Sequence, residues 1–162
     1  MDAPRWRRQR ALRLRGSEVL YSVVVPALDH LHAAARRALE KDGWTVTHDP
    51  LTLRMGGRSL YVDLGAEKLL AATRGNRRIA VEVKTFVGPS LIADLQQAVG
   101  QFAMYEEVLG QLEPGRELYL AIPQSILQSV LQDDIGQLMV QRRIPRILGF
   151  SPDTEEVIRW IP

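Results

Sequence analysis

An α/β fold, with helices flanking a central sheet, is predicted by three features of this 162-residue chain. Segments with the helical spacing of apolar residues alternate with short apolar segments that have the two-residue period of strands. Turn-forming Gly and Pro residues separate these segments at short intervals. The composition, 46% hydrophobic and 25% charged, is that of one globular domain large enough to bury a core.

Apolar residues recur at helical spacing in three segments. The first is expected to be capped by Asp29 and ended by Gly43. The segments are Asp29–Asp42, a long helix from the Gly88-Pro89-Ser90 break to about Leu112, and a stretch from Pro123 to about Arg143.

Eight shorter segments have the pattern of strands. They are Trp44–His48, Leu51–Met55, Ser59–Leu64, Lys68–Thr73, Arg78–Phe86, Glu117–Ile122, Arg146–Phe150 and Glu156–Ile161. Asp49 and Pro50 are predicted to form the turn after the first of them. The pattern is strongest in Arg78–Phe86, which predicts a strand buried on both faces.

The charge of the chain is unevenly distributed. Residues 1–15 contain six arginines and one acid, whereas the remaining residues contain 15 basic and 18 acidic side chains. Three interpretations of the basic segment are open: a signal or transit peptide, an arm that binds nucleic acid, or an extension from an over-long gene model. We expect residues 1–25 to be such an extension, disordered or wrongly annotated, and residues 26–162 to form the domain.

Several classes of protein are excluded by composition. The chain has no Cys, which excludes thiol catalysis, disulfides and Cys-type metal sites. No apolar run approaches the roughly 18 residues of a membrane span. We therefore expect a cytoplasmic protein with no membrane partner.

Three charged side chains occur on strands that are otherwise apolar. Glu82 and Lys84 leave the same face of Arg78–Phe86, and Asp63 lies in the apolar strand Ser59–Leu64. Burying such groups is costly unless they pair with each other or bind an ion. One hypothesis is therefore a structural ion pair, between Lys84 and either acid.

The other hypothesis is a metal site. The carboxylates of Asp63 and Glu82, with the main-chain carbonyl of Val83, would suit Mg²⁺ or Mn²⁺. Such an ion can polarise a phosphodiester and generate hydroxide, while Lys84 holds the attacking water and stabilises developing charge.

The same residues carry a resemblance to a known family. Asp63, Glu82-Val83-Lys84, and Gln101 followed by Tyr105 resemble the core of the PD-(D/E)XK nucleases. From about residue 26 to 162 the chain is also similar to the XisH family, the fdxN element excision controlling factors. The similar stretches are Ala38–Pro50, Asp63–Lys68, Ala80–Lys84 with Gly88-Pro89-Ser90, and Leu118–Pro123.

This resemblance implies a restriction-endonuclease-like fold, a mixed sheet with helices on both faces. It also implies a companion protein, XisI, and a link to site-specific excision of DNA elements. The last strand, Glu156–Ile161, is expected to pair with XisI or with a second copy in a homodimer.

Two more residues are candidates for the site. His32 lies at the edge of the apolar face of the first helix and matches a His of the family, whereas Glu40 should face solvent. His32 is therefore either a site residue or a half-buried residue held by a hydrogen bond. Gln101, one turn before Tyr105, can orient Lys84 or contact a phosphate. The expected catalytic residues are thus Asp63, Glu82, Lys84, Gln101 and His32.

Two functions remain open from the sequence. The first is a Mg²⁺-dependent DNA endonuclease, which the intact Asp63, Glu82 and Lys84 favour. The second is a regulatory or structural subunit of a XisH–XisI complex, which two features favour. Residues 16–162 are mildly acidic, and the first helix has His32 where many nucleases of the resembled fold have a Glu.

Overall fold

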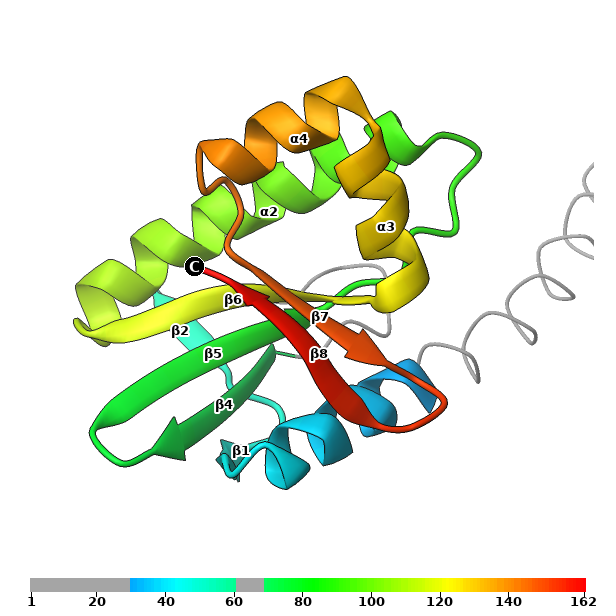
Figure 1. Ribbon diagram of the computed structural model, residues 1–162. Coiled ribbons are helices and arrows are strands. Elements are labelled where there is room, and N and C mark those ends of the chain that lie inside the picture. The colour runs from blue at the N-terminus through cyan, green and yellow to red at the C-terminus, as the bar shows by residue number, and fades with distance from the viewer. Residues whose placement is uncertain (1–29, 61–68) are drawn as a thin grey trace, which may run out of the picture.

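A six-stranded mixed sheet forms the centre of the molecule (Figure 1). The computed structural model describes residues 30–60 and 69–162. The strands of the sheet are β1 (Thr45–His48), β4 (Leu69–Arg74), β5 (Arg77–Val83), β6 (Arg116–Pro123), β7 (Ile147–Ser151) and β8 (Glu156–Ile161), in the order β1-β4-β5-β6-β7-β8. The pairs β5–β6 and β6–β7 are parallel, and the other neighbours are antiparallel. A separate hairpin consists of β2 (Leu53–Met55) and β3 (Arg58–Leu60).

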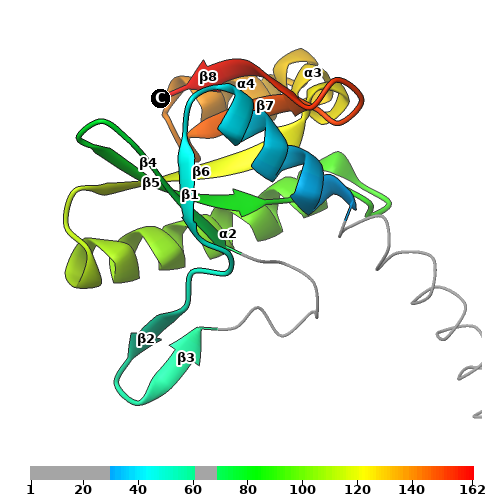
Figure 2. The same ribbon diagram turned by 90° about the horizontal axis from the view of Figure 1, so that it is seen from below.

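Helices cover both faces of this sheet (Figure 2). One face carries the helix over residues 30–41, here called the first helix, and the other carries α2 (Leu91–Leu112) with α3 (Gln124–Gln132) and α4 (Asp134–Gln141). Each helix set packs on its own apolar core. In the described part of the chain, no helix is long and apolar enough to cross a membrane.

The alternation predicted for β5 is confirmed. Ile79, Val81 and Val83 belong to the core under the first helix, whereas Ala80 belongs to the core under α2. Because side chains alternate along a strand, Glu82 points toward the α2 face. The mixed α/β fold with helices on both faces is thus confirmed.

The first helix ends where the sequence predicts. Gly43 has a φ of +88°, a conformation that favours glycine, and the Trp44 amide donates to the Leu39 carbonyl over 3.0 Å. The predicted amino-terminal cap, Asp29, lies outside the described residues.

The third helical stretch differs from the prediction because it is two helices. The Asp133 carboxylate accepts hydrogen bonds from the Ile135 and Gly136 amides, each 2.9 Å long, and so caps a new helix, α4. Gly136 also permits the close approach of the two helices, because a Cβ there would lie 2.1 Å from the Val130 carbonyl oxygen.

Most predicted strands differ from the observed ones by one or two residues at an end, and two differ by more. The strand predicted over Arg78–Phe86 ends at Val83, because the chain then turns toward α2, whose first turn is capped by Ser90. Of the strand predicted over Ser59–Leu64, the structure describes only the first two residues, in β3.

The last strand is held to the body by its aromatic residue. The ring of Trp160 lies 5.7 Å from Trp44 and 4.9 Å from Tyr119, centroid to centroid, and its Nε1 donates to Asp42 over 3.2 Å. Trp160 therefore packs inward, while β8 forms one edge of the sheet.

Candidate functional site

The candidate site lies at one edge of the sheet, where β1, β5 and β6 end. Because β4 is antiparallel to both β1 and β5, these two strands run in the same direction, and β6 is parallel to β5. Their last residues, His48, Val83 and Pro123, therefore mark one edge, which we call the carboxyl edge. The start of α2 lies at this edge too, because this helix connects the parallel strands β5 and β6.

Glu82 and Lys84 are the buried charged residues of the part of the chain that the structure describes. Their exposed fractions are 1% and 4%. Burial follows from the position of β5 between β4 and β6, with helices on both faces. The Lys84 amide continues the pairing of β5 with β6 by donating to the Ala121 carbonyl over 2.9 Å, so its backbone is fixed although β5 ends one residue earlier.

Gln101 and Tyr105 lie on α2, the helix that covers the face toward which Glu82 points. Tyr105 is 8% exposed and belongs to the core under this helix. Gln101 is half-buried, and its Oε1 atom is buried without a hydrogen-bond partner among the described residues. The amide is therefore available to a group that binds at this face.

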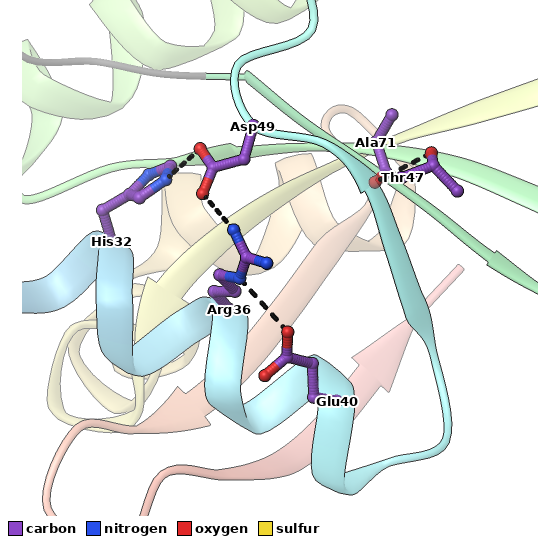
Figure 3. A network of polar contacts seen from close by, with 6 residues as sticks. All are labelled: His32, Arg36, Glu40, Thr47, Asp49 and Ala71. Atoms are coloured by element: carbon purple, nitrogen blue, oxygen red, sulfur yellow. Dashed lines mark hydrogen bonds and ion pairs between the residues drawn. The ribbon is translucent and has the colours of Figure 1, made fainter.

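His32 lies on the first helix and hence on the opposite face of the sheet. Its Nε2 is 2.8 Å from Oδ1 of Asp49, the residue that follows β1, and the two side chains are 12% and 18% exposed. Arg36, one turn later, donates to Oδ2 of Asp49 over 2.8 Å and to Glu40 over 3.1 Å (Figure 3). Glu40 is exposed, as predicted.

Asp49 keeps its negative charge because of these contacts. Burial by itself raises the pKa of this carboxyl group, but the hydrogen bonds of His32 and Arg36 outweigh burial. The net effect lowers the pKa of Asp49 from its usual 3.8. Asp49 is therefore an ionised acceptor of hydrogen bonds at neutral pH.

The sequence did not indicate a site role for Asp49. It was predicted to be part of a turn, and its partner His32 is 17 residues away along the chain. A carboxylate directly after a strand can indicate a site residue, but Asp is also common in turns because its side chain bonds to the nearby backbone.

The remaining predicted site residues are not all placed by the structure. Asp63 lies outside the described residues, so its position beside Glu82 stays a prediction. Leu69, six residues later, is paired with Glu82 across β4 and β5. Val83 has a side chain in the core under the first helix, and the metal-binding role of its carbonyl stays a prediction. Within residues 30–60 and 69–162, no three His, Cys, Asp or Glu side chains are grouped as metal ligands.

Comparison with known proteins identifies close structural relatives. The model of the XisH protein family matches residues 25–158. The crystal structure of an fdxN element excision controlling factor protein from Anabaena variabilis is 37% identical, with a TM-score of 0.74, covering 83% of this chain and 99% of that one. An XisH family protein from Nostoc punctiforme PCC 73102 is also 37% identical, with a TM-score of 0.73, covering 82% of this chain and 99% of that one. No curated protein matches this chain.

Proposed function

The chain belongs to the XisH family, and we propose that it is an excision controlling factor with a metal-dependent nuclease site of the PD-(D/E)XK type. The substrate class is DNA, and the reaction is hydrolysis of a phosphodiester bond. A XisI-type protein is the proposed companion. The relative from Anabaena variabilis, an fdxN element excision controlling factor protein, supports a role in the control of excision.

The burial of Glu82 and Lys84 at the carboxyl edge carries this proposal. Groups at 1% and 4% exposure have lost most of their hydration, which is costly for both charges. A catalytic site gains from the same burial, because a low dielectric strengthens the interaction of these groups with a phosphate or a cation.

The donor set fits a hard divalent cation. The buried Glu82 carboxylate, the Val83 carbonyl and the Asp63 carboxylate are oxygen donors, which Mg²⁺ and Mn²⁺ prefer. Asp63 lies six residues before Leu69, which is paired with Glu82, and its approach to Glu82 is part of this proposal. When bound, the cation would polarise the scissile phosphate and lower the pKa of a bound water molecule.

Residues of the chain would orient the attacking water and stabilise the charge that develops on the phosphate. The Lys84 ammonium group would hold the attacking water and offset the charge that develops on the phosphate. The Gln101 amide, with its buried Oε1, would accept a hydrogen bond from Lys84 and so fix the direction of the ammonium group.

The second candidate function is a regulatory subunit without nuclease activity. The observation that favours it is on the first helix, where the inward polar residue is His32 while Glu40 is exposed and bound to Arg36. The site therefore receives no carboxylate from this helix, which reduces the negative charge available to a cation.

Cleavage of supercoiled and linear DNA by the purified full chain, with and without XisI, separates the two functions. We expect cleavage with Mg²⁺ or Mn²⁺ and none with a chelator. Lys84→Ala should lower the rate by roughly 10² to 10³, as expected when one stabilising group is removed. The matched control is Lys41→Ala, because Lys41 is exposed and, within the described residues, donates a hydrogen bond to the Thr154 carbonyl over 2.7 Å.

Metal binding provides an independent measurement. Asp63→Asn should abolish Mn²⁺ binding in calorimetry, whereas Lys84→Ala should retain it. Absence of any metal-dependent cleavage by the wild type, with folded protein and XisI present, would rule out the nuclease and leave the regulatory subunit.

A further inference from the structure

Asp49 connects the first helix to the end of β1 through His32. Its two carboxylate oxygens are used separately, Oδ1 by His32 Nε2 and Oδ2 by Arg36 Nη1, each at 2.8 Å. Both contacts are visible in Figure 3, where Asp49 lies between the imidazole and the guanidinium. The carboxylate is therefore held from two sides, and it holds the imidazole in turn.

These contacts determine where His32 carries its proton. An ionised carboxylate only accepts hydrogen bonds, so the nitrogen facing it, Nε2, must be the one that bears the hydrogen. The other nitrogen, Nδ1, is buried and has no hydrogen-bond partner among the described residues. A hydrogen on Nδ1 as well would give the ring a positive charge and a buried N–H without an acceptor. This costs more free energy than a buried lone pair without a donor. The Nε2–H tautomer, with its lone pair on Nδ1, is therefore the form of the ring that satisfies Asp49 and leaves no buried donor without an acceptor.

Asp49, and with it the imidazole of His32, lies at the carboxyl edge. His48, the residue before Asp49, is paired with Ala71 of β4, which is paired with Ala80 of β5. The end of β1 thus lies two strand spacings from β5, or roughly 10 Å, level with Ala80, two residues before Glu82.

We propose that Asp49 is a positioning residue for His32, which it holds in the Nε2–H form so that the Nδ1 lone pair serves the carboxyl edge. There Nδ1 accepts a hydrogen bond from a water molecule bound beside the phosphodiester. The use of this water rests on the proposed nuclease function, whereas the tautomer itself does not. Arg36 contributes by occupying Oδ2 and leaving Oδ1 to His32.

Nitrogen-15 NMR of the imidazole groups tests the tautomer directly. The full chain has three histidines, and a His32→Gln variant assigns the signals of His32. In the wild type, Nε2 should be protonated and Nδ1 bare. In Asp49→Asn, Arg36 should keep the amide oxygen, so that the new NH₂ group faces His32 and donates to Nε2. The proton should then move to Nδ1.

Glu40→Gln is the matched control, because Glu40 contacts the same Arg36 but not His32. This variant should keep the wild-type tautomer. A wild-type ring with a proton on Nδ1, or an unchanged tautomer in folded Asp49→Asn, would overturn the proposal. The wild-type spectrum alone shows which nitrogen of His32 carries the proton, even if Asp49→Asn does not fold.

Cleavage assays then test the use of the lone pair. Asp49→Asn should lose roughly 10-fold to 100-fold in rate, as is typical when a residue that orients a functional His is changed, and Glu40→Gln should cleave like the wild type. Equal rates in Asp49→Asn and wild type would overturn the role at this edge. If the wild type cleaves no DNA, the proposed function fails, and the NMR result still decides the positioning of His32.

Discussion

The two ends of the strands in the central sheet, the carboxyl edge and the edge opposite to it, differ in how deeply their charged side chains are buried. At the edge where β5 and β6 begin, arginines are paired with acids near the surface: Arg77 with Glu117 and Arg74 with Asp42, where the four side chains are 33% to 55% exposed. Arg146, just before β7, pairs with Glu106 over 2.6 Å, and Arg116, the exception at 6% exposed, pairs with the part-exposed Glu113. At the carboxyl edge, Glu82 and Lys84 are almost fully buried, and Asp49 and His32 are mostly so.

This difference shows that the number of charges at an edge says little about its role. Exposed ion pairs are inexpensive to form and contribute little to stability. Buried charges cost free energy even when they are compensated, and their replacement by apolar groups often leaves stability unchanged or higher. The charges of the carboxyl edge are therefore better explained by chemistry than by stability.

The largest expected effect on stability concerns Glu82. Glu82→Ala should lower the free energy of unfolding by about 3 to 5 kcal/mol, because the ammonium group of Lys84 stays buried with one carboxylate fewer nearby. Glu106→Ala at the opposite edge should cost less than about 1 kcal/mol. Urea denaturation measures both, provided that the m-value is unchanged. Equal losses in the two variants would contradict the contrast between the edges.

An intermediate effect is expected for Asp49 and depends on pH. The pKa of Asp49 is lower in the folded than in the unfolded chain, so the ionised carboxylate stabilises the fold above the unfolded value, which is near 3.8. This stabilisation is lost as the pH falls through the folded value. Asp49→Asn should therefore be less stable than the wild type by about 1 to 2 kcal/mol at neutral pH.

The difference in the free energy of unfolding between Asp49→Asn and the wild type should shrink as the pH falls below about 4. Thermal or urea unfolding of both proteins across this range measures it. A difference that stays constant down to pH 2 would mean that the ionisation of Asp49 makes no contribution.

The smallest effect is expected for Arg77. Its pair with Glu117 is exposed, and its guanidinium lies 5.5 Å from the centroid of the Trp44 ring. Arg77→Ala should cost less than about 1 kcal/mol, and the ion-pair part should disappear at high salt, because exposed charges are screened. A loss above 2 kcal/mol at both salt concentrations would show that the opposite edge also depends on its charges.

Much of the architecture could be predicted from local patterns. The period of two in β5 indicated which residues face each helix, and the apolar stripe of the first helix indicated that Glu40 points to solvent. Glu82 and Lys84 were recognisable as candidates because they interrupt an apolar strand. These inferences depend on residues within a few positions of one another, which the periods of helices and strands relate directly.

Other features required the tertiary structure. The break between α3 and α4 depends on Asp133 acting as a cap and on the closeness of Gly136 to Val130, which helical spacing alone does not reveal. The end of β5 at Val83 depends on the turn toward α2.

The sequence by itself determined the family, the order of the elements and the two charged residues of β5, because each is encoded in short segments of the chain. Only the tertiary structure decided that His32, Arg36 and Asp49 meet, since their contacts span 13 and 17 residues and two different elements. The physical reason is that a side-chain contact between elements depends on strand direction and sheet order. These bring the end of β1 and the amino-terminal half of the first helix to the same edge as Glu82 and Lys84.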